Sequence, residues 1–263
     1  MFDYHIHTNF SDDCMTPMDE MIKAAVKKGV RELAITDHYD PDYPDINFPF
    51  EIDFPKYHQK LTEVSETYKN KIKILKGIEI GIQHGDTLKK CELAAKAFPY
   101  DIVLGAFHSA CSADLYCQYF KDRNPVTGIM DYYLYMAGCL KEFKDFDVLG
   151  HINVIDRYAE FVPDYAPYME IIESILKGLI HEGKGIEINA SSHWYGMGER
   201  TLPSKEILTL YKALGGEIIT IGSDAHTAPQ VGYAYQKAVD MLISHGFLYV
   251  ATFEDRKVNF VKI

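Results

Sequence analysis

The chain has 263 residues, 47% of them hydrophobic, and a formal net charge of -11. This length suits one (β/α) barrel or one large α/β domain, and no apolar run reaches the roughly 18–20 residues of a membrane helix. The negative charge argues against a long nucleic acid as the main partner, because phosphate backbones bind clustered lysine and arginine.

The predicted strands are seven short runs that are rich in β-branched residues and apolar on both faces, as in parallel sheets. They cover residues 2–7, 31–37, 72–80, 101–107, 146–151, 184–189 and 216–223. Because helical patterns alternate with these runs along the whole length, the sequence predicts a single α/β domain over residues 1–263.

The first predicted helix begins at Thr16-Pro17, with the threonine as N-cap and the proline in the first turn, and it ends at Gly29. Further helices are predicted over residues 87–97, 129–144, 166–182, 203–214 and 232–245. Residues 39–56 form a loop rich in proline, aspartate and aromatic residues, and its length suggests a functional lid. Residues 111–127 form a second long loop.

The N-terminus and the cysteines indicate a cellular compartment. The first residues, MFDYHIHTNFSDD, contain acids and lack the basic start of a signal peptide. The five cysteines are an odd number without a CxxC motif, which is typical of reduced thiols. We therefore expect a cytoplasmic protein with no membrane partner, whose oligomeric state the sequence does not indicate.

Histidines and carboxylates recur where the apolar runs end. They are His5, His7, Asp12, His38, Glu79, His108, His151, Asp224 and His226. Functional sites in parallel α/β folds form at the carboxyl ends of the strands, so we expect these side chains to converge.

The spacing also favours a closed barrel. His5 and His7 are two residues apart and point to the same side of a strand. If the sheet closes, the first strand neighbours the seventh, and Asp224 lies beside this pair. A separation above about 10 Å between the His5 and Asp224 side chains would contradict this arrangement, because neighbouring strands lie about 5 Å apart.

Imidazole and carboxylate ligands suit zinc, manganese or iron. Nine candidate ligands are too many for one ion, so we expect two or three divalent ions. Their charge would attract a phosphate monoester, and water bound to such an ion has a pKa of about 7.

The order of the motifs identifies a family resemblance. The motifs are His5-x-His7-Thr8 with Ser11-Asp12, Thr36-Asp37-His38, Gly77-Ile78-Glu79, His108-Ser109, Gly150-His151 and Gly222-Ser223-Asp224-Ala225-His226. In this order they resemble the PHP (polymerase and histidinol phosphatase) superfamily, and the length resembles its stand-alone histidinol-phosphate phosphatases. The resemblance implies a distorted (β/α)7 TIM-like barrel with a trinuclear metal centre.

The resemblance also implies how the ligands are shared among the ions. The first ion would be held by His5, His7, Glu79 and Asp224. The second would share Glu79 and add His108 and His151, and the third would be held by Asp12, His38 and His226.

Other residues are candidates for substrate binding and catalysis. We expect a metal-bridging hydroxide to attack phosphorus while Arg157 and Arg200 clamp the phosphate, although either arginine could instead form a surface ion pair. Asp37 could protonate the leaving alkoxide, orient a ligand or form a turn. Asn189 and His193 are candidate substrate contacts after the sixth strand.

Histidinol phosphate carries an ammonium group and an imidazole, and the predicted lid offers groups for both. Its acids are Asp40, Asp42, Asp45, Glu51 and Asp53, and its aromatic residues are Tyr39, Tyr43, Phe48 and Phe50.

The sequence thus favours a metal-dependent phosphatase that hydrolyses L-histidinol phosphate in histidine biosynthesis. A PHP phosphoesterase acting on nucleotides or oligonucleotide ends is the alternative enzyme. A non-catalytic, metal-bound regulatory module is the alternative of another class.

Overall fold

The computed structural model describes residues 1–162, 164–198 and 200–263. Its core is a parallel sheet with the strand order β1-β2-β4-β5-β8-β9-β10. These strands are β1 (Phe2–Asp3), β2 (Glu32–Ile35), β4 (Lys73–Gly81), β5 (Ile102–Ala106), β8 (Val148–Leu149), β9 (Gly185–Asn189) and β10 (Ile219–Gly222). Each predicted run overlaps one of them. A short strand, β3 (His38–Tyr39), pairs with the far end of β4.

The sheet closes where β1 meets β10. The Tyr4 amide donates to the Ile221 carbonyl at 2.9 Å, and the Asp224 amide donates to the His5 carbonyl at 2.8 Å. As a result His5 Nε2 and Asp224 Oδ1 lie 3.7 Å apart, well inside the predicted limit. The predicted distorted (β/α)7 TIM-like barrel is confirmed.

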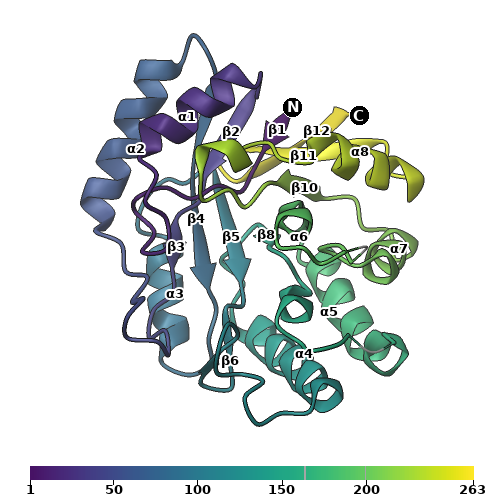
Figure 1. The fold of residues 1–263 in the computed structure, drawn as a ribbon. Helices are drawn as coiled ribbons and strands as arrows, with labels where there is room; N and C mark the ends of the chain where they lie inside the picture. Colours follow the sequence, from purple (N-terminus) through teal and green to yellow (C-terminus); the bar gives the residue numbers. More distant parts are fainter. Residues whose placement is uncertain (163, 199) are drawn as a thin grey trace.

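Helices surround the strands (Figure 1). They are α1 (Met18–Lys27), α2 (Phe54–Tyr68), α3 (Thr87–Ala95), α4 (Pro125–Glu142), α5 (Met169–His181), α6 (Ser191–Trp194), α7 (Lys205–Ala213) and α8 (Tyr235–Ser244). None of the helices in the described ranges combines the length and the apolar character that a membrane span requires.

Helix α2 is not among the predicted helices, although the sequence contains its amphipathic pattern. Tyr57, Leu61 and Val64 are buried at helical spacing, and Asp53 caps the first turn by accepting from the Lys56 amide at 3.2 Å. The start of α1 also differs, because Pro17 occupies the cap position. The Thr16 hydroxyl instead donates to the His226 carbonyl at 3.1 Å and thereby connects the segment before α1 to the loop after β10.

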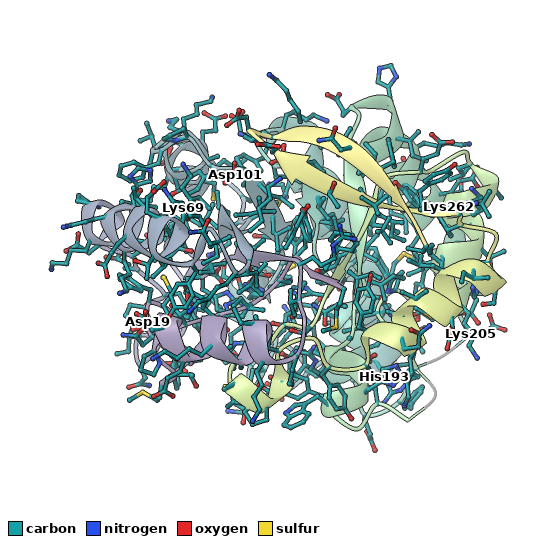
Figure 2. The ribbon with its side chains drawn as sticks, turned by 90° about the horizontal axis from the view of Figure 1, so that it is seen from above. Asp19, Lys69, Asp101, His193, Lys205 and Lys262 are labelled. Atoms are coloured by element: carbon teal, nitrogen blue, oxygen red, sulfur yellow. The ribbon has the colours of Figure 1, made fainter. Side chains whose placement is uncertain are left out.

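A C-terminal hairpin, which the sequence does not predict, covers the amino end of the barrel. It consists of β11 (Tyr249–Glu254) and β12 (Lys257–Lys262), and it lies beside the start of the chain (Figure 1). The Arg256 amide donates to the Asp101 carbonyl at 2.9 Å, and Asp101 lies just before β5 (Figure 2). The Phe253 amide donates to the Tyr4 hydroxyl at 3.1 Å. The hairpin therefore covers the end of the barrel opposite to the ligand residues.

Candidate metal centre

Ligand atoms from distant parts of the sequence converge at the carboxyl ends of the strands. Among the described residues, four groups of three bring such atoms within 4.8 Å of one another: His5, His7 and Asp224; His5, Glu79 and His151; His7, His38 and His226; His38, Asp40 and His108. All of the predicted ligands except Asp12 occur in these groups. The structure therefore brings together side chains from both ends of the sequence, as the strand-end pattern requires.

Glu79, near the end of β4, lies at the middle of the cluster and is fully buried. Its Oε2 atom lies 3.1 Å from His5 Nε2 and 3.0 Å from His38 Nδ1. Its Oε1 atom lies 2.9 Å from His151 Nε2 and 3.3 Å from His108 Nε2. The two oxygens of one carboxylate thus face two different sets of imidazoles, which is the geometry of a bridging ligand.

Several of these atoms are close to each other without being hydrogen-bonded. Within the described residues, His5 Nε2, His38 Nδ1 and Glu79 Oε2 have no hydrogen-bond partner although all three are buried. Buried polar groups are normally paired, and the orientation of these atoms does not satisfy hydrogen-bond geometry. A donor set of imidazole nitrogens and carboxylate oxygens with unused lone pairs fits a divalent cation.

The electrostatic environment keeps Glu79 and His7 in forms that suit a cation. For His5, His38 and His108, burial lowers the pKa, but neighbouring carboxylates outweigh it and raise the pKa above its usual value. Burial raises the pKa of Glu79, but His5, His38 and His108 outweigh it and hold this pKa well below its usual value. Burial lowers the pKa of His7 to about 3, with further lowering by His38 and His226, so His7 stays a neutral imidazole. Neutral imidazole and ionised carboxylate are the forms that bind metals.

Asp13, rather than Asp12, accompanies His38 and His226. The Asp13 carboxylate lies 3.2 Å from His226 Nε2 and 3.7 Å from His38 Nε2. Burial lowers the pKa of His226, but Asp13 raises it to about 9 overall. Asp12 points away and accepts a hydrogen bond from the Phe50 amide at 2.7 Å, so it fixes the loop after β3. The adjacent acids cannot be told apart by sequence, because the turn alone decides which one points inward.

Two carboxylates lie behind the imidazoles and orient them. His5 Nδ1 lies 3.0 Å from Glu187 Oε2, and the other oxygen of Glu187 accepts from the His151 amide at 2.9 Å. His108 Nδ1 lies 2.6 Å from Asp40 Oδ2. Such carboxylates fix the ring orientation and raise the basicity of a metal ligand. An acid inside a fully buried strand, as in GIEIN of β9, is the signal that identifies Glu187 from sequence.

Asp37 does not face the cavity. It is fully buried and accepts from the Thr8 amide at 2.6 Å, the Thr8 hydroxyl at 2.8 Å and the Ser11 hydroxyl at 2.8 Å. Ser11 Oγ lies in turn 3.3 Å from His7 Nδ1. This geometry corresponds to the ligand-orienting alternative and leaves Asp37 without access to a leaving group.

Asn189, at the end of β9, also belongs to the frame behind the ligands. Its amide nitrogen donates to Glu187 Oε1 at 2.8 Å and lies 3.4 Å from Asp224 Oδ2. Its carbonyl oxygen accepts from the Ser191 amide at 3.1 Å. Asn189 therefore positions carboxylates, and its side chain is not among those that line the cavity.

A cavity of about 570 Å³ opens over the cluster. It is lined by Asp13, His38, Tyr43, Asp45, Phe48, Phe50, His108, Asp114, Tyr116, Cys117, His151, Val154, Arg157, Tyr158, Tyr195, Asp224 and His226. Clefts of this size enclose small ligands. Part of the predicted lid, residues 43–50, thus does form a wall of the cavity.

Only one of the two candidate phosphate-binding arginines reaches the cavity. The Arg157 guanidinium lies 3.9 Å above the Tyr195 ring, donates to Ser191 Oγ at 2.6 Å and lies 3.8 Å from Asp224. Within the described residues its Nε has no hydrogen-bond partner. Arg157 is therefore held rigidly beside the candidate metal ligands, and its Nε–H can still donate a hydrogen bond.

Arg200 and His193 are not brought to the cavity. Arg200 is exposed and donates to the carbonyls of Asp156 at 2.8 Å and Met197 at 3.2 Å, which fastens the loop after α6. His193 lies on α6, at the edge of the molecule in Figure 2, and does not line the cavity. A position after a strand end thus correctly indicated Arg157 but not these two residues, because His193 lies on α6 and the Arg200 side chain binds backbone carbonyls.

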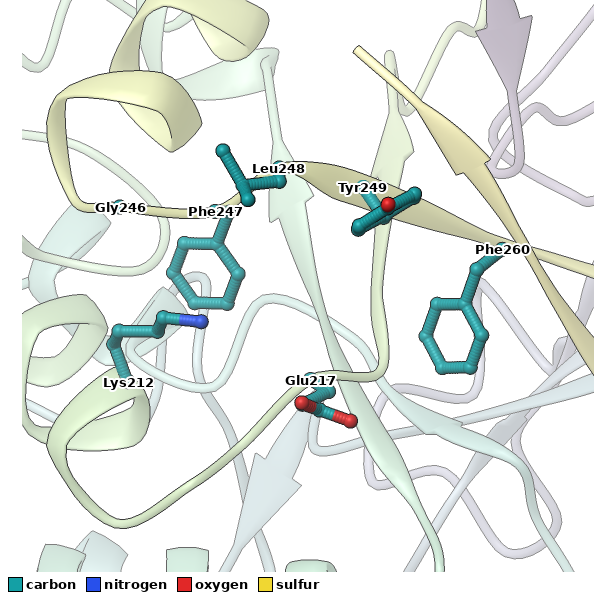
Figure 3. A pocket seen from close by; sticks show the side chains of 7 residues that line it. All are labelled: Lys212, Glu217, Gly246, Phe247, Leu248, Tyr249 and Phe260. Carbon is teal, nitrogen blue, oxygen red and sulfur yellow. The ribbon is translucent and has the colours of Figure 1, made fainter.

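A second cavity, of about 360 Å³, lies at the amino end between α7 and the hairpin (Figure 3). Lys212 Nζ lies 4.7 Å from the Phe247 ring centroid there. Among the described residues that line this cavity, Glu217 is the single carboxylate and none is a histidine. The donor set of a metal centre thus belongs to the carboxyl-end cavity.

Residues 3–191 match the PHP domain family, and the chain belongs to this family. It is 32% identical to the probable histidinol-phosphatase of Clostridium acetobutylicum, over 92% of each chain. It is 27% identical to the histidinol-phosphatase of Lactococcus lactis, over 98% of this chain and 96% of that protein. The structure is similar to the crystal structure of the Lactococcus lactis histidinol phosphate phosphatase complexed with zinc, L-histidinol and phosphate. The TM-score is 0.89 at 26% identity, with 98% of each chain covered.

Proposed function

We propose that this protein is a metal-dependent phosphomonoesterase that hydrolyses L-histidinol phosphate to L-histidinol and phosphate, a step of histidine biosynthesis. The observation that carries the proposal is Glu79, whose two oxygens face two sets of imidazoles in the cavity that Arg157 also lines. The similarity over nearly the whole length to a phosphatase with bound zinc, L-histidinol and phosphate supports the choice of substrate.

We assign the cluster to two or three divalent ions, with zinc, manganese and iron as the candidates. The assigned groups are His5, His7, Glu79 and Asp224; Glu79, His108 and His151; and Asp13, His38 and His226. Ions bound there would supply a hydroxide nucleophile at neutral pH and would neutralise charge on the phosphate oxygens. Asp13 takes the place of Asp12 in this assignment.

The protein's own side chains bind and orient the ester. Arg157 binds a phosphate oxygen through its guanidinium, which Tyr195 and Ser191 hold in place. Glu187 and Asp40 keep the His5 and His108 rings turned toward the cavity. The aromatic wall of the cavity encloses the organic part of a small ester.

We place this activity in the cytoplasm. All five cysteines are free thiols: Cys14, Cys91, Cys111, Cys117 and Cys139. Free thiols are typical of a reducing compartment.

Phosphate release from a panel of esters tests the function. The chelated protein is supplied with zinc, manganese or iron and offered L-histidinol phosphate, a mononucleotide and a phosphodiester. We expect L-histidinol phosphate to give the highest kcat/KM, and activity to depend on the added ion. Faster release from the nucleotide or the diester, or failure of every ion to restore activity, would contradict the proposal.

A further inference from the structure

Asp156 is a buried acid that directly precedes Arg157 in the chain but does not line the cavity. Both residues belong to η1 (Val154–Arg157), a short 3-10 helix that begins shortly after His151. Asp156 is 1% exposed and is absent from the cavity wall, whereas Arg157 forms part of that wall. The two adjacent side chains therefore leave η1 in different directions, one into the protein and one toward the candidate phosphate site.

Hydrogen bonds connect the Asp156 side chain to neighbouring segments. Its Oδ2 atom accepts from the Tyr165 hydroxyl, in the segment before α5, and from Asn153 Nδ2 at 2.8 Å. Asn153 Nδ2 also donates to the Thr201 carbonyl at 3.1 Å, in the loop before α7. Burial raises the pKa of Asp156 to about 6, against the hydrogen bonds from Tyr165 and Asn153, so the group is mainly ionised at neutral pH. The carboxylate thus fastens η1 to two other parts of the chain.

A single 3-10 turn depends on such contacts to keep one orientation. Helix η1 has four residues, and the hydrogen-bond geometry of 3-10 helices is too poor to hold a short turn by itself. Ile155 is buried in the core, but apolar burial is non-directional and does not fix the rotation of the turn. With three residues per turn, adjacent side chains point about 120° apart. The direction in which Asp156 is held therefore determines where Arg157 points.

We propose that Asp156 is a positioning residue, whose hydrogen bonds hold η1 in the orientation that brings the Arg157 guanidinium to the phosphate. This inference rests on the proposed function. The guanidinium end of Arg157 is held by Ser191 Oγ at 2.6 Å and by the Tyr195 ring at 3.9 Å. Because arginine has a long stem with much rotamer freedom, a fixed donor requires that its backbone end is held as well. Asp156 supplies that second attachment.

The hydrogen bonds of Asp156, rather than its charge, carry this role. Both donors meet Oδ2, whereas Oδ1 is buried and has no hydrogen-bond partner among the described residues. In Asp156→Asn the amide oxygen can accept from the same two donors, with the amide nitrogen at the position of Oδ1. Asp156→Ala removes both bonds. The pair of variants therefore separates the loss of the attachment from the loss of the charge.

The central test is a double-mutant cycle that introduces Asp156→Ala into the wild type and into Arg157→Ala. In the wild type we expect about tenfold lower kcat/KM for L-histidinol phosphate and about tenfold weaker binding of inorganic phosphate, the effect of a lost hydrogen bond. In the Arg157→Ala background the same substitution should change either quantity by less than about twofold. Steady-state kinetics, and calorimetry of inorganic phosphate with the zinc-loaded proteins, measure the cycle.

Three further variants complete the comparison. Asp156→Asn should restore phosphate affinity to within about threefold of the wild type. Tyr165→Phe removes one donor to Oδ2 and should give a smaller loss than Asp156→Ala, again only when Arg157 is present. This variant carries the test in both backgrounds if Asp156→Ala does not fold. Glu160→Ala, which removes an exposed acid shortly after η1, is the matched control and should behave as the wild type. Zinc content is measured throughout because η1 lies close to His151 in the chain.

Equal losses of phosphate affinity in the two backgrounds would overturn the inference, because Asp156 would then act independently of Arg157. Wild-type affinity in both Asp156→Ala and Tyr165→Phe would also overturn it. So would an Asp156→Asn variant as weak as Asp156→Ala, since the effect would then belong to the charge. If the wild type binds inorganic phosphate but does not hydrolyse L-histidinol phosphate, the proposed function fails, and the binding cycle still decides the role of Asp156.

Discussion

The two ends of the barrel are built on opposite principles. At the amino end, the hairpin β11–β12 is fastened by satisfied contacts, such as the Arg256 guanidinium with the Asp147 carboxylate at 3.0 Å, and Phe253 is buried in the core. At the carboxyl end, imidazoles and acids are buried without hydrogen-bond partners, as at His5 Nε2 and Glu79 Oε2 among the described residues. The first arrangement favours folding, whereas the second costs free energy and is retained for binding.

Non-glycine residues with positive φ values occur at both ends, because Asp255 and Arg256 in the hairpin turn adopt them as well. Two of the proposed ligands, His151 and Asp224, have positive φ values of 22° and 54°. Side chains rarely adopt this region, which costs about 1–3 kcal/mol per residue and persists where surrounding structure enforces it. Here the strain turns both side chains from the strand direction into the cluster. Changes at the carboxyl end should therefore reduce activity more than stability, and changes at the amino end should do the reverse.

At Glu79 we expect the largest difference between the effect of a substitution on activity and its effect on stability. Glu79→Gln should lower kcat/KM by about 1000-fold or more, because charge stabilisation by bound ions contributes several kcal/mol to catalysis. The chelated variant should unfold at a lower temperature than the chelated wild type, because the ionised carboxylate that pairs with the surrounding imidazoles is lost. Steady-state kinetics and zinc content measure the loss of activity, and thermal unfolding measures the change in stability. Activity within tenfold of wild type at normal zinc content would remove Glu79 from the centre.

The two arginines give the next largest contrast. Arg157→Ala should lower kcat/KM for L-histidinol phosphate about 10- to 150-fold, the range of a lost charged hydrogen bond. Arg200→Ala, its matched control, should stay within about threefold because its side chain binds only backbone carbonyls among the described residues. Steady-state kinetics of both variants decide the matter. Equal losses would mean that Arg200 also contacts the phosphate.

Much of this site can be predicted from sequence because strand ends are local signals. Histidines and acids that close successive apolar runs identified the candidate metal ligands, and the spacing of His5 and His7 together with barrel closure predicted their proximity to Asp224. These inferences depend on the period of a strand and on the order of strands. Both are fixed by the chain itself.

The remaining features depend on tertiary contacts. The choice of Asp13 over Asp12 is decided by the turn before α1, which Asp37 holds through Thr8 and Ser11. The orientation of Arg200 depends on its hydrogen bonds to the carbonyls of Asp156 and Met197. The hairpin β11–β12 has an ordinary strand pattern, but its role of covering the amino end follows only from where Arg256 and Phe253 find partners.

Glu187 tests the difference between a ligand and a positioning residue, because it lies at the carboxyl end of the barrel but behind the candidate ligands. Glu187→Gln should weaken zinc binding about 10- to 100-fold, since the carboxylate that orients His5 is lost. Activity should recover largely when zinc is added in excess, which distinguishes a positioning residue from a ligand such as Glu79. Titration of the chelated protein with zinc, followed by activity and by calorimetry, measures the effect. Wild-type zinc affinity in the variant would show that His5 is held by its strand alone.

The smallest effect is expected at the amino end, from Arg256→Ala. Burial raises the pKa of Asp147 and Arg256 opposes it, so the arginine stabilises the ionised carboxylate. Its removal should lower the free energy of unfolding by about 1 kcal/mol, because the pair is partly buried. This deficit should be full at neutral pH and shrink as the pH falls and Asp147 takes up a proton in both proteins.

Urea unfolding of wild type, Arg256→Ala and the exposed neighbour Lys257→Ala, at pH 7 and at pH 4, measures that deficit. Zinc content and kcat/KM should remain at wild-type values in both variants, because the hairpin lies at the far end of the strands from the cluster. A loss of activity without a loss of stability would mean that the hairpin transmits its position through β4 and β5 to Glu79 and His108. In that case the two ends of the barrel would be coupled, and the division of labour between them would not hold.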